Sequence, residues 1–158
     1  MIRKMRRFKQ ALTAEVCETI LLNAKRGVLA VLGDDDYPYT IPLNYVYDPG
    51  AQTVYFHGAR EGHKIDAIAG HPKVSFCVVD QGAPDEGGWF QYVNSVVAFG
   101  TIAPVTDKAE SIDITREIAE KYYPDRESAA REVEKDGARA LCLALKIEHM
   151  TGKRVHEK

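Results

Sequence analysis

The chain passes from a predicted strand into a predicted helix at residues 57–64, which read His57-Gly58-Ala59-Arg60-Glu61-Gly62-His63-Lys64. Free N–H groups and the dipole at a helix N-terminus favour an anion, above all a phosphate. Gly58 and Gly62 let the backbone approach such an anion closely. Lys64 places a positive charge where the dipole prefers a negative one, and an anion between the two would relieve this conflict. The spacing is equally compatible with an ordinary strand–loop–helix that carries a surface lysine, because it matches no established phosphate-loop fingerprint.

Apolar runs and turn residues on both sides of this turn predict six strands, at residues 28–32, 37–47, 53–57, 74–79, 95–104 and 140–149. Helices are expected at residues 13–25, 63–69, 106–122 and 128–136. Thr13 and Thr106 are the predicted N-caps, Gly27 is expected to end the first helix, and Gly100 indicates a bulge. Antiparallel strands joined by hairpins, with helices at the ends, predict a mainly β barrel with peripheral helices.

Size and charge set the broad class of the protein. The 158 residues suit a single domain, 1–158, and the net charge of −2 argues against nucleic-acid or anionic-membrane partners. Residues 1–10 are basic with no apolar stretch behind them, so we expect a mobile arm rather than a secretory signal. No segment is apolar enough to span a membrane. The three cysteines, Cys17, Cys77 and Cys142, lie far apart, which suits reduced thiols in the cytoplasm. Cys77 and Cys142 lie in apolar runs and are expected in the core.

Other polar and aromatic residues leave alternatives open. Pro42 removes a ladder donor, so it either frees backbone groups to face a planar heterocycle or protects a sheet edge. His71 follows Gly70 and is a candidate acid or substrate contact, although capping of the preceding helix is the favoured role. The aromatic residues 89–92 could stack on a ligand or pack in a subunit interface. The histidine and cysteine spacings fit no zinc pattern, so we expect no metal site.

Together these segments resemble the pyridoxamine 5′-phosphate oxidase-like FMN-binding split barrels and, within them, the nitroimidazole-resistance family. The resemblance covers about residues 5–153. The residues that carry it are Arg6-Arg7, Gly27-Val28-Leu29-Ala30, Pro42-Leu43-Asn44-Tyr45, Tyr55-Phe56-His57-Gly58-Ala59, Gly62-His63-Lys64, His71-Pro72-Lys73-Val74-Ser75-Phe76, Tyr92 with Ser95-Val96, Gly100 and Thr151-Gly152-Lys153.

The resemblance implies a six-stranded antiparallel split β-barrel that works as a homodimer with one FMN at each subunit interface. The cofactor-binding residues that it implies are Pro42, Leu43 and Asn44 along the flavin ring and ribityl chain, His57, Gly58, Ala59, Gly62, His63 and Lys64 around the phosphate, and Tyr92 and Ser95 from the partner chain. Gly62-His63-Lys64 stands where the oxidase proper has Ser-Arg-Lys, which argues against oxidation of vitamin B6 phosphate.

The expected function is therefore an FMN-dependent reductase of small electron-poor molecules such as nitroimidazoles, with reduced nicotinamide as a possible electron donor. Hydride can pass directly to and from a flavin, so no catalytic side chain is required. The alternatives are a non-catalytic flavin-binding or sensing protein on the same fold, or a barrel that binds haem or a deazaflavin.

Overall fold

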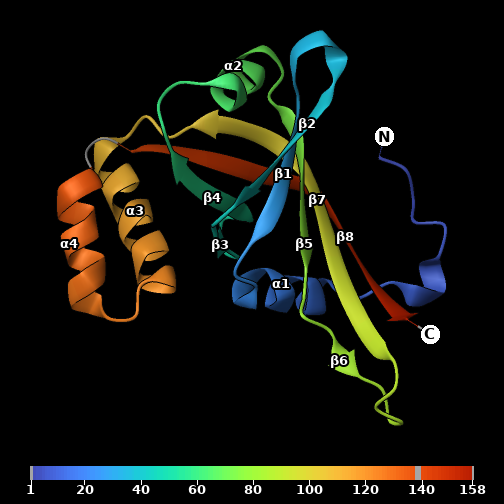
Figure 1. Cartoon of the computed structure of the whole chain (residues 1–158). Helices are drawn as coiled ribbons and strands as arrows, with labels where there is room; N and C mark the ends of the chain where they lie inside the picture. Colours follow the sequence, from blue (N-terminus) through green and yellow to red (C-terminus); the bar gives the residue numbers. More distant parts are fainter. Residues whose placement is uncertain (1, 138–139, 158) are drawn as a thin grey trace.

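The computed structural model describes residues 2–137 and 140–157, so Met1 of the expected mobile arm lies outside the described residues. Its strands are β1 (Gly27–Leu32), β2 (Pro38–Leu43), β3 (Val46–Asp48), β4 (Thr53–Gly58), β5 (Lys73–Val79), β6 (Ala83–Pro84), β7 (Gln91–Pro104) and β8 (Leu141–Glu157). Its α-helices are α1 (Ala14–Asn23), α2 (His63–Gly70), α3 (Lys108–Tyr122) and α4 (Arg126–Asp136), and short 3-10 turns lie at Phe8–Gln10 and Asp34–Asp36. Figure 1 shows a curled sheet with its helices at the periphery.

All strand pairs are antiparallel, and the sheet order is β2-β1-β5-β7-β8-β4-β3, with β6 added to β7. The expected mainly β fold with peripheral helices is confirmed. The described residues form eight strands rather than the six expected. The predicted strand 37–47 divides into β2 and β3, and β6 is an additional short strand. The ordered path does not return from β3 to β2, so the sheet is curled but not closed.

The concave side of the sheet holds the main hydrophobic core, which α1 and α2 complete from two ends. Side chains with no exposed surface include Leu21 of α1, Leu29 of β1 and Phe76 of β5. Thr13 caps α1 as predicted, because its hydroxyl group accepts from the N–H of Val16. The helix ends at Asn23, so the prediction that Gly27 ends it was wrong. Gly27 instead begins β1, where a Cβ atom would collide with the ring of Phe76.

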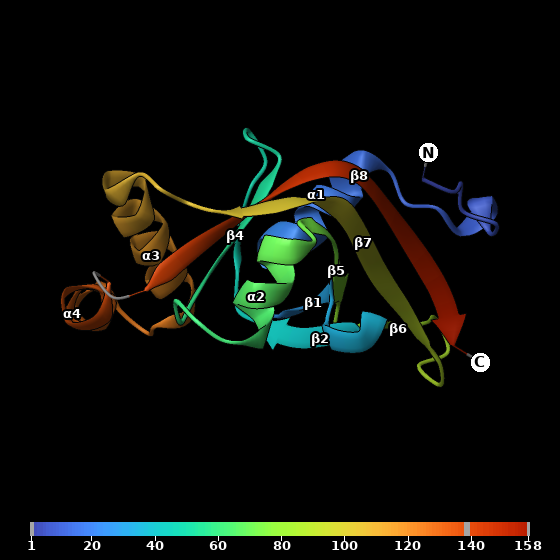
Figure 2. The ribbon, with the colours of Figure 1, turned by 90° about the horizontal axis from the view of Figure 1, so that it is seen from above.

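Helix α3 covers the opposite, convex side of the sheet over β3, β4 and the start of β8. Ile114 and Ile118 of α3 pack there against Val46 and Cys142, and α4 packs on α3, outside the sheet (Figures 1 and 2). The predicted N-cap of this helix was wrong by one residue, because Asp107 rather than Thr106 accepts from the N–H of Glu110. Both residue types cap helices well, and here the Asp107 carboxylate accepts this bond at 2.8 Å.

The rest of the convex side, over β1, β5 and β7, carries no helix (Figure 2). Val28 of β1 is 39% exposed and Val79 of β5 is 55% exposed. Cys77 is half-buried on this side, so only Cys142 of the two cysteines expected in the core is fully buried. Strands with apolar side chains on both faces are typical of sheets that are covered on both sides.

The longest ladder joins β7 to β8, and β8 runs to Glu157, well beyond the predicted end at residue 149. Its register shifts between Phe99 and Gly100, which confirms the bulge predicted at this glycine. A Cβ atom at Gly100 would collide with the backbone oxygen of Lys146. Within the described residues, no helix is long and apolar enough to cross a membrane.

Candidate functional site

The turn between β4 and α2 depends on the backbone conformation of Gly62. This residue is the N-cap of α2, with φ 117° and ψ 170°. Only glycine adopts such angles without a large cost. A Cβ atom at Gly62 would meet no other atom within 4 Å, so the requirement is conformational rather than steric. The space beside the turn is therefore open, as a ligand that approaches the backbone would need.

Lys64 provides a positive charge at this turn. A Cβ atom added to Gly58 would lie 3.0 Å from the Nζ atom of Lys64. The side chain is half-buried, and burial lowers the pKa of its ammonium group. Among the described residues, no hydrogen-bond acceptor or carboxylate pairs with this ammonium. The N–H groups of His63 and Lys64 also lack acceptors within the helix, as in the first turn of any helix.

The side chain of His63 is engaged by the turn that follows β1. Its ring stacks on Tyr39, with centroids 4.3 Å apart and planes at 16°. Its Nε2 atom lies 3.2 Å from the backbone nitrogen of Asp34 and 3.7 Å from the Asp34 carboxylate. In the shorter contact, Nε2 accepts a hydrogen bond from the N–H group of Asp34. The His63 ring therefore contacts the connection between β1 and β2, while its backbone lies in the first turn of α2.

His57, at the end of β4, connects the turn to a small cavity under α3 and α4. Its pKa is lowered by burial and then by the charge of Lys64, whereas Glu132 of α4 raises it. The cavity has a volume of about 130 Å³ and is lined by His57, Asn44, Glu132 and side chains of α3. Lys64, His57 and Asn44 thus form one continuous group, in which the structure brings together predicted residues from three separate segments.

Tyr122, at the end of α3, is a site residue that sequence reasoning missed. Its hydroxyl oxygen accepts from the N–H of Tyr45 at 2.9 Å, lies 2.9 Å from the backbone oxygen of Tyr45 and contacts the backbone oxygen of Lys25 at 2.5 Å. Tyr45 follows Asn44, so Tyr122 holds the chain at the point where β2 gives way to β3. No local pattern indicates this contact, because 77 positions separate the two tyrosines.

The other predicted residues of the same segments lie next to this group. Pro42 is exposed near the end of β2 and pairs with Val28 on the uncovered side of the sheet. Leu43 is half-buried against the core, and Ala59 is exposed immediately after β4. Pro42 does lie in an edge strand, since β2 ends the sheet order.

Tyr92 and Ser95 lie elsewhere in the subunit. They belong to the first half of β7, near β6 and at the end of the sheet remote from α2 (Figure 1). The Tyr92 ring stacks on the His156 ring with their centroids 4.5 Å apart. Ser95 lies opposite Lys153 in the β7–β8 ladder. A single chain therefore does not bring these two residues to the turn at Gly62.

His71 occupies the position expected for a capping residue. It is the C-cap of α2, and its backbone N–H bonds to the backbone oxygen of Ala67. Its side chain is exposed. No contact joins it to the group around Lys64, so the structure adds nothing to the candidate catalytic role of His71.

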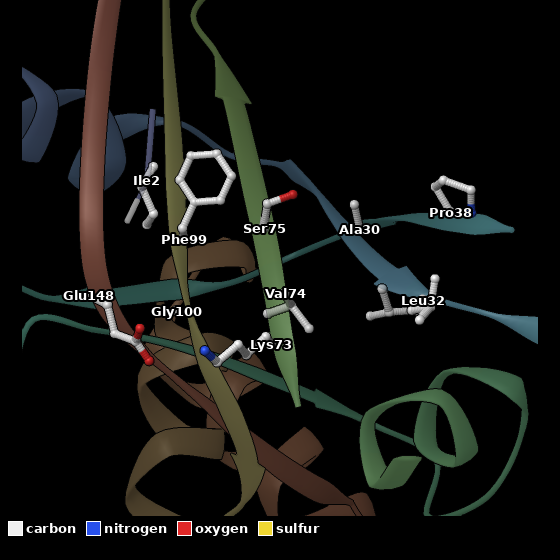
Figure 3. A pocket seen from close by; sticks show the side chains of 11 residues that line it. Ile2, Ala30, Leu32, Pro38, Lys73, Val74, Ser75, Phe99, Gly100 and Glu148 are labelled. Atoms are coloured by element: carbon white, nitrogen blue, oxygen red, sulfur yellow. The ribbon is translucent and has the colours of Figure 1, made fainter. Parts of the chain in front are cut away.

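A shallow hollow of about 400 Å³ lies on the uncovered side of the sheet. Figure 3 shows Phe99 of β7 and Ser75 of β5 pointing into it, with Pro38 of β2 at one margin and Ile2 of the N-terminal arm at the other. Lys73 and Glu148 are the charged residues of its lining. The wall is otherwise mainly apolar, so the hollow suits contact with a flat apolar surface.

Comparison with known proteins places this geometry in a family. The model of the pyridoxamine 5′-phosphate oxidase family matches residues 13–154 of the chain. A comparison with curated protein sequences gives no match.

Three solved structures illustrate the similarity of the fold. A Bacteroides thetaiotaomicron protein, assigned provisionally to 5-nitroimidazole antibiotic resistance, has a TM-score of 0.76 at 18% identity, covering 93% of this chain and 87% of its own. A FAD-binding protein from Mesorhizobium loti has a TM-score of 0.65 at 22% identity, and the match covers 92% of this chain and 96% of the Mesorhizobium protein. A FAD- and haem-binding protein from Mycobacterium smegmatis has a TM-score of 0.71 at 17% identity, and the match covers 91% of this chain and 72% of the Mycobacterium protein. At these identities the structures show a shared fold.

Proposed function

Because the chain belongs to the pyridoxamine 5′-phosphate oxidase family, we propose that it is a flavoprotein that binds FMN and reduces small electron-poor molecules such as nitroimidazoles. Proteins of similar structure bind FAD, with or without haem. The residues that would hold the phosphate are Gly58, Gly62, His63 and Lys64, the last through its ammonium group and the others through their backbone.

The observation that supports this proposal most is the isolation of the Lys64 ammonium group. A half-buried cation without a protein partner is costly, and this one lies beside a helix N-terminus, where it opposes the dipole. A phosphate would bond to both the ammonium group and the N–H groups of His63 and Lys64. The chain therefore maintains an unfavourable charge arrangement that an anionic ligand would make favourable.

The same proposal includes a homodimer. The uncovered convex side over β1, β5 and β7 is apolar, and a second copy of the chain would cover it. Tyr92 and Ser95 lie far from Lys64 within one subunit, so they would reach a flavin only across such an interface. A mass in solution of twice the 17.6 kDa of the chain, measured by light scattering, supports the dimer, and a monomer that binds FMN tightly contradicts it.

In the proposed reaction the flavin would supply the electron-transfer chemistry, and the protein would supply binding and orientation. Pro42, Leu43 and Asn44 would lie along the ring and ribityl chain, with Tyr122 holding the backbone just after Asn44. Reduced nicotinamide is the proposed electron donor. His71 remains a candidate contact to substrate, exposed at the end of α2.

The test of cofactor binding compares two lysine variants. Lys64→Met should weaken FMN binding by about tenfold or more, because hydrogen bonds to charged groups contribute about 1.5–3 kcal/mol. Lys146→Met, which alters an exposed lysine of β8, serves as the control and should bind FMN normally. Equal affinity in both variants would contradict the proposed phosphate site. The absorption spectrum of the purified protein distinguishes a flavin from haem or a deazaflavin.

The test of activity uses the protein loaded with FMN. Oxidation of reduced nicotinamide that depends on a 5-nitroimidazole, measured without oxygen, supports a reductase. FMN bound tightly with no turnover of any electron-poor acceptor would favour a non-catalytic flavin-binding or sensing protein.

A further inference from the structure

Three polar residues line the cavity under α3 and α4, and the charge of Glu132 acts on His57 within it. Asn44 comes from the connection between β2 and β3, His57 from β4 and Glu132 from α4. Among the residues that the structure describes, none of these side chains takes part in a hydrogen bond or salt bridge. Asn44 and Glu132 are half-buried, whereas part of the His57 residue is exposed to solvent. Polar groups that face a cavity and lack partners are typical of ligand sites, because elsewhere such groups would bond to one another or to backbone.

The remainder of the lining is largely apolar. Ile118 and Ala119 of α3 are 3% and 5% exposed, and the rings of Tyr122 and Tyr123 complete the wall. The hydroxyl group of Thr115 also borders the cavity, but it already bonds to the backbone oxygen of Ser111 at 2.8 Å. The site therefore combines an apolar floor with three available polar groups.

The charge of the lining is negative. Glu132 is its only carboxylate, and no lysine or arginine of the described chain lines the cavity. The positive charge of Lys64, in the β4–α2 turn, acts on His57 from outside the cavity. A flavin phosphate bound at that turn would offset the Lys64 charge. The Tyr122 ring already has the ammonium groups of Lys121 and Lys25 at 5.6 and 5.7 Å from its centroid. Recognition of a cation would consequently depend on Glu132 rather than on this ring.

The volume limits the size of the ligand. An apolar cavity of about 150 Å³ holds one benzene molecule, and this cavity measures about 130 Å³. A drug-sized molecule needs at least about 300 Å³. The enclosed part of a ligand can therefore be no larger than a single small ring or a short chain.

We propose that this cavity binds a small organic ammonium compound of about one ring, with the ammonium group on the carboxylate of Glu132 and the ring on Ile118 and Ala119. Asn44 and His57 would accept further hydrogen bonds from the ligand. The inference rests on the proposed function in one respect: Asn44 and His57 also belong to the proposed flavin site, so the bound ammonium compound would lie beside that flavin.

The test titrates the FMN-loaded protein with benzylammonium and with benzyl alcohol, its neutral counterpart of similar shape, by ligand-observed NMR. The wild type should bind benzylammonium about tenfold more tightly, as one charged hydrogen bond worth about 1.5 kcal/mol predicts. Glu132→Gln should abolish this preference while leaving the binding of benzyl alcohol unchanged. Glu134→Gln, at an exposed position of the same helix, should retain the preference.

Two results would overturn the proposal: no preference for the ammonium probe in the wild type, or a preference that survives in Glu132→Gln. The same titration without FMN separates this inference from the proposed function. If FMN does not bind at all, the flavoprotein proposal fails, whereas a preference that depends on Glu132 in the flavin-free protein still supports the amine site.

Discussion

The hydroxyl oxygen of Tyr122 lies 2.9 Å from both the backbone nitrogen and the backbone oxygen of Tyr45. Tyr45 sits between β2 and β3, outside the regular ladder of either strand. The hydroxyl group therefore accepts the hydrogen bond of the Tyr45 N–H, and its single proton is shared between the backbone oxygens of Lys25 and Tyr45. It joins α3 to the corner of the sheet beside Asn44. This contact connects the stability of the fold with the shape of the candidate site.

Removing that hydroxyl group should destabilise the protein. Tyr122→Phe leaves the N–H group of Tyr45 without an acceptor and removes the donor that the backbone oxygens of Lys25 and Tyr45 share. Leaving a buried polar group unpaired costs about 1–3 kcal/mol. Urea unfolding monitored by circular dichroism measures the loss. Tyr37→Phe, at a side chain that is 74% exposed, is the control and should not change the stability. Equal stabilities of the two variants would show that the Tyr45 backbone finds another partner.

Lys121 should make the stability depend on pH. Its Nζ atom is buried without a hydrogen-bond partner among the described residues and lies 4.1 Å from the centre of the Tyr45 ring. Burial, and then the charge of Lys25, lower its pKa from 10.5 to about 8. Between these two values the unfolded chain binds more protons than the folded one, so the contribution of Lys121 to the unfolding free energy rises with pH. Below pH 8 the folded state bears the full cost of the buried charge.

Urea unfolding of the wild type and of Lys121→Met at several pH values from 7 to 9.5 measures this effect. The wild type should gain stability relative to the variant as the pH rises. Staying below pH 10 limits the opposing contribution of Tyr45, whose pKa burial raises. A constant difference between the two proteins across this range would contradict the lowered pKa.

Gly62 and Gly70 form a matched pair at the two ends of α2. Gly62→Ala should destabilise the protein by about 1–3 kcal/mol, because its φ of 117° is unfavourable for alanine. It should also weaken FMN binding by distorting the turn. Gly70 has no positive φ and open space around it, so Gly70→Ala should stabilise the protein by about 0.4–1 kcal/mol. Thermal unfolding with and without FMN measures both effects, and similar behaviour of the two variants would refute the conformational argument.

Asp85 should control the order of the hairpin that precedes β7. Its carboxylate lies 3.0 Å from the Nε2 atom of His156, and this contact lowers the pKa of Asp85. His156 also stacks on Tyr92, and Trp89 at the tip is 88% exposed. Asp85→Ala should therefore speed amide hydrogen exchange in residues 81–91 without changing that of the core. Glu86→Ala is the control, and identical exchange in both variants would mean that the contact does not order the hairpin.

Features governed by short-range rules were predictable from the sequence. The cap at Thr13, the start of α2 after Gly62 and the bulge at Gly100 all follow from hydrogen-bonding capacity or steric freedom within a few residues. The cap of α3 shows the limit of such rules. Thr106 and Asp107 are both good caps, and the residue types alone do not distinguish between them. The strand predicted at residues 37–47 failed for a related reason, because its interruption at Tyr45 requires a partner far along the chain.

The sequence by itself determined the class of the fold and the segments that carry the candidate phosphate site, since apolar periodicity and glycine positions act locally. Tertiary structure alone decided that Glu132 and His57 line one cavity, that the ammonium group of Lys64 has no hydrogen-bond or salt-bridge partner among the described residues, and that the His63 ring stacks on Tyr39. Such relations depend on packing between elements separated by tens of residues. Burial and charge pairing are properties of the assembled surroundings, and no stretch of sequence contains them.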